Sequence, residues 1–206
     1  MKNIYITNIP LQKTLEKQNY VAADNFRFKD RLKTVFPIVP VIDHTFEEDE
    51  AAKLIAIGIN GASYEKNLNL LKDELAERGI TNIEIEELRI EDSDAYANGI
   101  ELFLKILEKI DDDSVIRACP TYGEKGMSIT MLSLLQAVPL LKKNVEVLDV
   151  VYGKIPWTEE KTTNPTLYDI SGLLRLNSII VEVSNMGLAE PETAIRKLIE
   201  LGKEKG

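Results

Sequence analysis

A glycine-containing loop between a predicted strand and a predicted helix has the residue types best suited to chemistry in this sequence. Gly123 and Gly126 allow backbone amides to approach a ligand closely, and Lys125 supplies a positive charge. Thr121 and Ser128 add hydroxyl groups, and the helix that opens near Gly126 presents N–H groups without intrahelical acceptors. Together these groups favour an anionic ligand such as a phosphate.

The spacing of this loop matches neither of two common phosphate-binding motifs. A Walker loop would end in Gly-Lys-Ser/Thr, and a dinucleotide-binding turn would contain Gly-x-Gly-x-x-Gly. A turn from a strand into a helix also needs glycine for its own geometry. Composition alone therefore leaves a structural and a functional interpretation of the loop open.

The elements that must position this loop alternate between strands and helices. The predicted strands are residues 4–7, 54–59, 83–86, 115–119, 145–152 and 179–183. The predicted helices are residues 64–78, a segment with Ile100, Phe103, Leu104 and Leu107 on one face, residues 127–141, and a last helix that opens at Pro191. Residues 35–42 are rich in β-formers but contain Pro37 and Pro40, which predicts an edge strand or an extended loop.

This alternation predicts an α/β, Rossmann-like, doubly wound and mostly parallel sheet with a short C-terminal helical appendage. We expect a ligand-binding domain over residues 1–184 and a C-terminal helix and tail over residues 185–206. The last helix is expected to bury Ile195, Leu198 and Ile199. Trp157 lies in a polar connection and is interpreted either as an anchor in an interface or lid, or as an ordinary surface aromatic.

Composition excludes several classes of protein. Of the 206 residues, 44% are hydrophobic and 29% are charged, which is typical of a soluble globular protein and not of a disordered chain. The net charge of −9 disfavours nonspecific binding to duplex nucleic acid. No segment is long and apolar enough to span a membrane, and a lone cysteine cannot form an internal disulfide, so we expect a cytoplasmic protein.

Candidate catalytic and metal-binding side chains are few. His44 is the only histidine, so a Ser-His-Asp triad would have to use it, and we expect it to be solvated in an acidic loop. No metal site and no cofactor are expected. Cys119 ends a predicted buried strand, and we interpret it as a core residue and not as a nucleophile.

Residues 121–128, read as Thr-Tyr-Gly-Glu-Lys-Gly-Met-Ser, resemble the signature of CARF domains, the CRISPR-associated Rossmann fold. Many of these domains carry Asn-x-Thr-Gly-Gly-Thr-Lys-x-Met at this turn, and relatives carry Asp-x-Thr-His-Gly-Phe-Arg. Residues 145–153 are similar to the strand of that family that ends in Tyr-Gly, and residues 164–173 to its Tyr-Asp-Leu-Thr-Pro-Leu continuation. The resemblance is strong over residues 114–175 and absent after about residue 184.

The resemblance implies a homodimer that binds a cyclic oligoadenylate second messenger in type III CRISPR antiviral signalling. It also implies regulation of an effector domain or a partner. By the motif, Thr121 and Gly123 line the ligand, Lys125 neutralises phosphate, and Met127 begins the helix. Five further residues complete the predicted ligand-binding set: Asn8 and Ile9, by their position after the first strand, and Tyr122, Glu124 and Gly126, within the loop.

Departures from the family pattern leave some roles open. Cys119 replaces Asn or Asp, Tyr122 replaces Gly or His, and Glu124 replaces Thr or Phe. Tyr122 could stack on an adenine or simply pack. Glu124, also in the predicted ligand-binding set, would either point away from the anion or contact a ribose or adenine edge.

Two other functions remain open at this stage. The first is a metal-independent ring nuclease that cleaves the messenger, with Lys125, Thr121 and Tyr122 as its candidate catalytic residues. The second is a flavodoxin-like or other nucleotide-binding α/β protein. That protein would need a phosphate loop after the first strand, where Asn8-Ile9-Pro10-Leu11 is a poor match.

Overall fold

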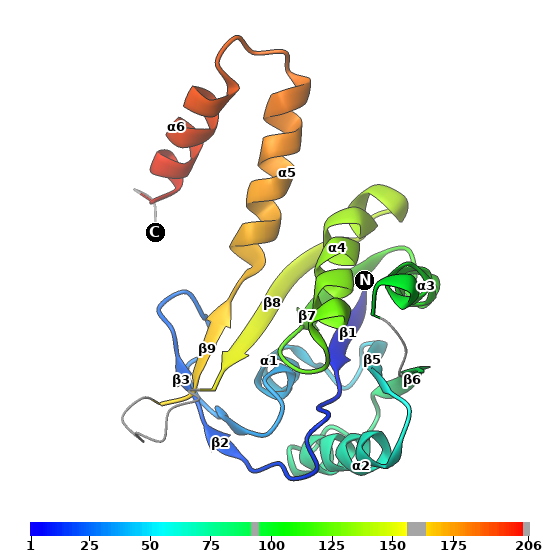
Figure 1. The fold of residues 1–206 in the computed structure, drawn as a ribbon. Coiled ribbons are helices and arrows are strands. Elements are labelled where there is room, and N and C mark those ends of the chain that lie inside the picture. The colour runs from blue at the N-terminus through cyan, green and yellow to red at the C-terminus, as the bar shows by residue number, and fades with distance from the viewer. Residues whose placement is uncertain (92–94, 156–163, 204–206) are drawn as a thin grey trace. The chain divides into compact units, whose positions relative to one another are not determined.

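Strand β1 (Lys2–Asn8) lies in the middle of a seven-stranded sheet (Figure 1), in a computed structural model that describes residues 1–91, 95–155 and 164–203. The strands follow the order β3-β9-β8-β7-β1-β5-β6. The partners of β1 are β5 (Ala52–Ile59) and β7 (Ser114–Cys119), both parallel to it. The remaining strands are β6 (Glu84–Ile90), β8 (Glu146–Lys154), β9 (Thr166–Asp169) and β3 (Val21–Ala22).

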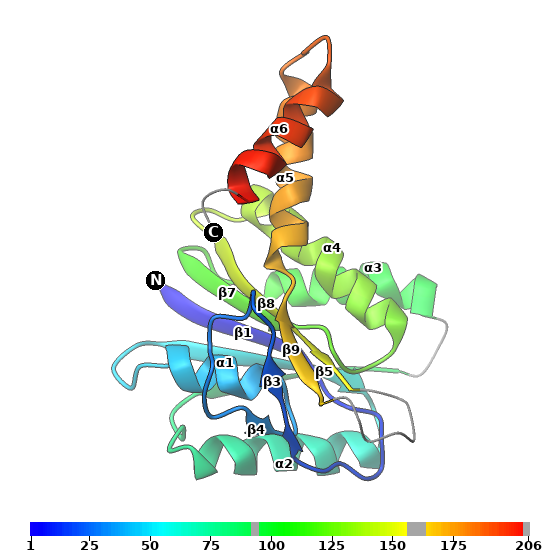
Figure 2. The same ribbon diagram turned by 90° about the vertical axis from the view of Figure 1, so that its left-hand side faces the viewer.

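Helices cover both faces of this sheet. In Figure 2, α1 (Ile38–Thr45) and α2 (Ala62–Glu77) lie below the sheet, and α3 (Ala95–Glu108) and α4 (Lys125–Leu141) lie above it. Among the described strands of this sheet, the pairing of β9 with β8 is the one antiparallel pairing, and β3 runs parallel to β9. A two-stranded ladder of β2 (Gln18–Asn19) and β4 (Lys33–Thr34) belongs to the long segment between β1 and α1. The prediction of a doubly wound, mostly parallel α/β fold is confirmed.

Helix α2 follows its sequence pattern closely. Leu68, Leu71 and Leu75 form its buried face, as their spacing predicts. The helix ends at Glu77, and Gly79 follows with a φ of +80°, the left-handed conformation that favours glycine. The Gly79 N–H donates to the Ala76 carbonyl, so this glycine closes the end of the helix.

The prediction of an extended segment over residues 35–42 is wrong, because α1 occupies most of it. Pro37 stands at the N-cap with a helical φ of −55°, and a proline at the start of a helix sacrifices no intrahelical hydrogen bond. Val39, Val41 and Ile42 are then buried against the core. Burial of this apolar face outweighs the β propensity of the sequence.

His44 is also placed differently from the expected solvated acidic loop. It lies in the last turn of α1, half-buried, with its ring 4.8 Å from that of Phe28. Its Nδ1 lies 2.7 Å from the Pro40 carbonyl and its Nε2 lies 2.7 Å from an Asp30 carboxylate oxygen. The histidine therefore fastens the segment before α1 to this helix.

Helix α3 presents to solvent two of the four residues of the apolar face that its sequence singles out. Ile100 is 69% exposed and Leu104 is 51% exposed, whereas Leu102 and Ile106 are buried. The helix carries two apolar stripes, and the core needs only one of them. The second stripe is left on the surface of the molecule.

The chain divides into two units, Met1–Ser171 and Gly172–Gly206. Helices α5 (Ser171–Asn185) and α6 (Pro191–Lys203) form the second, joined through Gly187, whose φ is +64°. The strand predicted over residues 179–183 is wrong, because these β-branched residues continue α5, and propensity is a weak guide against context. The predicted burial along α6 is also wrong, since Leu198 and Ile199 are exposed.

Trp157 and the rest of residues 156–163 lie outside the described part of the chain, as do residues 204–206. No helix in the described ranges combines the length and the apolar character needed to cross a bilayer.

A buried lysine organises the amino-terminal edge of the sheet. Lys53 on β5 is 5% exposed, and its ammonium lies 2.9 Å from Glu86 and 3.4 Å from Asp111. Lys109 makes a second ion pair with Glu86 at 2.9 Å. Burial raises the pKa of Glu86, but hydrogen bonds from Lys53 and Lys109 outweigh it and bring that pKa below its usual value.

Glu86→Gln should therefore lower the free energy of unfolding at pH 7 by on the order of 1–2 kcal/mol. Because the folded pKa of Glu86 is lowered, its contribution is present above the unfolded pKa and is lost as the pH falls through the folded value. Urea unfolding between pH 7 and pH 3 should show a difference between parent and variant that shrinks toward acid. A difference that stays constant with pH would contradict the charged pairing.

Candidate functional site

The candidate loop starts at the point where the sheet changes its direction of growth. After β1 the chain builds β5 and β6 on one side, and it then returns to place β7 on the other side of β1. In an open α/β sheet, ligands bind outside the carboxyl ends of strands at such a point. The loop that joins β7 to α4 begins there (Figure 1).

Asn8, the last residue of β1, fixes this loop against the sheet. Its side-chain amide donates to the Tyr122 carbonyl at 2.7 Å and to the Ser128 hydroxyl at 3.3 Å. The Ser128 hydroxyl in turn donates to the Pro120 carbonyl at 2.7 Å. Asn8 is fully buried, so its side chain is not exposed for contact with a ligand and its part in this region is to hold the loop. Ile9, the other residue predicted after β1, is 1% exposed and packs in the core.

Tyr122 is an anchor of the loop. Its side chain is 8% exposed, its hydroxyl donates to the Val35 carbonyl at 2.7 Å, and its ring meets Phe36 edge-on. Burial raises the pKa of the phenol to about 12. Of the two interpretations of Tyr122, the structure favours packing over stacking on a ligand.

Thr121 ties the loop to the neighbouring strand β8. Its hydroxyl accepts the Gly153 N–H at 2.9 Å and lies 3.1 Å from the Cys119 sulfur. A Cβ on Gly153 would lie 2.5 Å from Pro37 Cγ, so a glycine is required for this close approach. Cys119 is fully buried, and burial raises the pKa of its thiol, which agrees with a core role.

The segment that the loop presents outward is short. Gly123 has a φ of +83°, and Met127 packs beneath it in the core. Glu124 occupies the N-cap of α4 with its carboxylate exposed, and Lys125, the first residue of the helix, is exposed as well. Within the described residues, Lys125 has no acidic partner.

Lys125, as the first residue of α4, lowers the stability of that helix. A cation at a helix N-terminus opposes the positive end of the helix dipole by about 0.3–1 kcal/mol. The first N–H groups of α4 also have no intrahelical acceptors, and no side chain caps them. The lysine and these amides together form a local positive site that suits an anion, on a chain with a net charge of −9.

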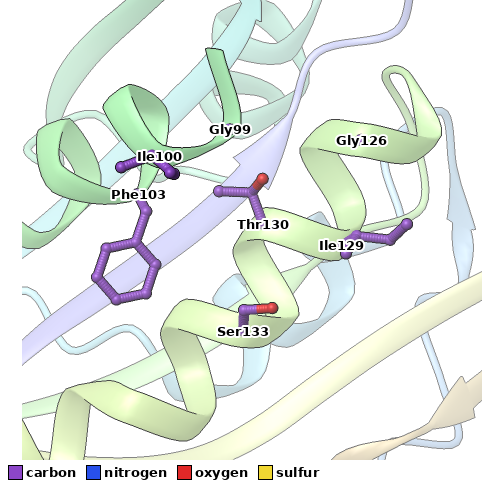
Figure 3. A pocket seen from close by; sticks show the side chains of 7 residues that line it. All are labelled: Gly99, Ile100, Phe103, Gly126, Ile129, Thr130 and Ser133. Carbon is purple, nitrogen blue, oxygen red and sulfur yellow. The ribbon is translucent and has the colours of Figure 1, made fainter. Parts of the chain in front are cut away.

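In the described part of the chain, two cavities and one groove lined by residues of the loop can be described. The β1/β5 cavity, of about 320 Å³, is lined by residues 9–11, residues 59–64 and Glu124. The β8 cavity, of about 430 Å³, is lined by Gln12, Thr121, Tyr122 and residues 152–155. The α3/α4 groove, of about 500 Å³, is lined by Gly99, Ile100, Phe103, Gly126, Ile129, Thr130 and Ser133 (Figure 3).

No family model matches the chain, and no curated protein matches it. Across the described ranges, no three side chains among His, Cys, Asp and Glu gather where they could hold a metal ion.

Sequence reasoning identified the candidate loop and also residues 60–63, a second loop at the carboxyl end of a predicted strand, which line the β1/β5 cavity. It assigned no ligand to this second loop, and it missed the α3/α4 groove. The groove had a weak signal, namely that α3 carries more apolar residues than one face can hold.

Asn8→Asp tests how strongly the loop depends on its anchor. The variant keeps the shape of the side chain but replaces a donor with a carboxylate that faces the Tyr122 carbonyl. We expect the free energy of unfolding at pH 7 to fall by on the order of 1–3 kcal/mol.

The deficit should shrink as the pH falls, because the buried carboxyl then regains a proton that it can donate. Asn69→Asp, at an exposed position of α2, is the matched control and should change little. A variant as stable as the parent at neutral pH would show that the Asn8 amide does not hold the loop.

Proposed function

We propose that this chain is a homodimeric sensor of a cyclic oligoadenylate and that it regulates an effector domain or a partner in type III CRISPR antiviral signalling. The ligand would lie against the outward segment 123–126 of the loop. The observation that carries the proposal is Lys125, an exposed cation without an acidic partner in the described ranges, beside uncapped N–H groups at the switch point of the sheet. The resemblance of residues 114–175 to CARF domains supplies the identity of the anion.

The α3/α4 groove supports the dimer. Ile100 and Ile129 are 69% and 66% exposed, and both line this groove, whose lining residues are labelled in Figure 3. Gly99, Gly126 and Ser133 are small, so a second helix could approach closely. Gly126 also belongs to the loop, and a second copy seated here would therefore bring a second Lys125 to the same ligand. One lysine is too little for a multiply charged ring, which is why we commit to a second copy as the occupant.

The two alternative functions have less support. Of the candidate residues for a ring nuclease, Tyr122 is buried and the Thr121 hydroxyl is engaged with Gly153, which leaves only Lys125 exposed. A flavodoxin-like site would need free backbone amides after β1. There the Ile9 N–H donates to the Ile57 carbonyl, and Pro10 has no N–H.

Lys125→Glu should weaken binding of the ligand by on the order of 10–100-fold, because a charge-assisted phosphate contact contributes about 1.5–3 kcal/mol. The fold should survive, since an acidic residue at this position favours the helix dipole. Affinity for cyclic tri-, tetra- and hexa-adenylate, followed by chromatography of the products, is the measurement.

Lys142→Glu, at the other end of α4, makes the same charge change and should leave affinity nearly unaltered. Absence of binding to all three rings by the parent would overturn the proposed function, and linear products would favour the ring nuclease.

Ile129→Glu should convert the dimer to a monomer at micromolar concentration, because it places a charge in the apolar groove. Leu140→Glu is the matched control, since Leu140 is 84% exposed on the same helix but outside the groove. Light scattering with circular dichroism separates dissociation from unfolding. A parent protein that is monomeric with and without cyclic oligoadenylate would count against the dimer.

A further inference from the structure

Glu74 on α2 is a carboxylate that the fold buries. It is 2% exposed, and one of its oxygens, Oε2, accepts the Val35 N–H at 3.1 Å. The other oxygen, Oε1, lies 3.7 Å from a guanidinium nitrogen of Arg78. Burial of a carboxylate is costly unless hydrogen bonds and a cation replace its hydration. The hydrogen bond from the Val35 N–H is therefore a strong constraint on the backbone at that residue.

Val35 connects this carboxylate to the candidate loop. Its N–H donates to Glu74, and its carbonyl accepts the Tyr122 hydroxyl at 2.7 Å. All three residues are buried, so both hydrogen bonds are shielded from water. A side chain of α2 and a side chain of the loop are thus held by the two backbone groups of one residue.

The segment around Val35 is itself a closed turn. The Thr34 hydroxyl accepts the Phe36 N–H at 2.9 Å and donates to the Phe36 carbonyl at 2.8 Å. Phe36 is fully buried, and its ring meets the ring of Tyr122 edge-on. Because residues 34–36 are tied to one another, a displacement of the Val35 N–H would also move the groups that contact Tyr122.

Arg78 holds the same segment at a second place. Its guanidinium lies 2.7 Å from the carboxylate of Asp43 on α1 and donates to the backbone carbonyls of Arg31 and Lys33. The end of α2 therefore fixes the chain before α1 through Arg78. Glu74 alone extends this attachment to the residue that contacts the loop.

We infer that Glu74 is a positioning residue for the candidate loop. It holds the Val35 N–H, and Val35 in turn holds the Tyr122 hydroxyl and with it the outward segment 123–126. The effect on binding rests on the proposed function, since a displaced loop would meet the ligand less well. The coupling between Glu74 and the loop belongs to the free protein and can be measured without a ligand.

Hydrogen exchange of the free protein tests this coupling. Glu74→Ala removes the acceptor of the Val35 N–H, so the amides of residues 121–128 should exchange on the order of 10-fold faster relative to those of β5. Glu74→Gln keeps an oxygen acceptor and should bring the ratio back toward the parent value. Glu74→Asp withdraws the carboxylate by one methylene and replaces Glu74→Ala in the comparison if that variant does not fold. An unchanged ratio in the variant used would overturn the inference.

A double-mutant cycle identifies the route of the coupling. Tyr122→Phe removes the hydroxyl that donates to Val35 and should itself speed exchange in the loop. In that background Glu74→Ala should add less than about 2-fold, because the connection through Tyr122 is already broken. Effects of the two substitutions that multiply in full would show that Glu74 does not act through Tyr122.

Asp43→Asn is the matched control for loss of stability. It weakens the other ion pair of Arg78 and leaves the hydrogen bond between Glu74 and Val35 in place. The free energy of unfolding should fall, but the exchange ratio between the loop and β5 should stay at the parent value. An equal rise of this ratio in Asp43→Asn and Glu74→Ala would reduce Glu74 to a structural residue and contradict the inference.

Affinity for cyclic tetra-adenylate supplies the functional readout. If the loop of Glu74→Ala is in place about a tenth of the time, affinity should fall on the order of 10-fold, and Glu74→Gln should restore most of it. Unaltered affinity in Glu74→Ala, with a parent that binds, would rule out positioning for the ligand. A parent that binds none of the tri-, tetra- and hexa-adenylate rings would overturn the proposed function, while hydrogen exchange would still decide whether Glu74 holds the loop.

Discussion

The parallel pairing of β1 with both β5 and β7 is the constraint on which the candidate site depends. It places the carboxyl ends of three strands at one edge of the sheet, although their sequences are separated by tens of residues. Because the connections on either side of β1 run in opposite directions, the loops diverge at this edge and leave room past the end of β1. The hydrogen bond from the Asn8 side chain to the Tyr122 carbonyl then fixes the position of the loop between β7 and α4.

Residues of the candidate loop divide into anchors and presented groups. The loop is held by three hydrogen bonds to different parts of the fold. The Thr121 hydroxyl accepts from the Gly153 N–H, the Tyr122 hydroxyl donates to the Val35 carbonyl, and the Ser128 hydroxyl donates to the Pro120 carbonyl. A ligand would meet mainly the backbone from Gly123 to Gly126, together with the two charged side chains between them. A loop held in this way would not have to be ordered by a ligand, which would lower the entropic cost of association.

Part of the apolar surface that the first unit does not use for its own core lies between α3 and α4. Ile100 and Phe103 of α3 and Ile129 of α4 line one groove, and this groove reaches the loop through Gly126. Apolar surface of this kind marks a site for a partner. Binding of a ligand by the loop and association through the groove would therefore be physically linked, because both involve the first turn of α4.

Sequence alone determined the alternation of strands and helices, the buried central strands, the core face of α2 and the position of the glycine loop. These features follow from local periodicity and from turn residues that act within a few positions. The tertiary structure alone decided that residues 38–45 and 179–183 are helical. It also decided which stripe of α3 is buried and that Tyr122 faces inward to Val35. Each of these features depends on contacts with elements that are distant in the sequence. An apolar stripe or a phenol becomes part of the core only when another element packs against it, and the local sequence does not show which element that is.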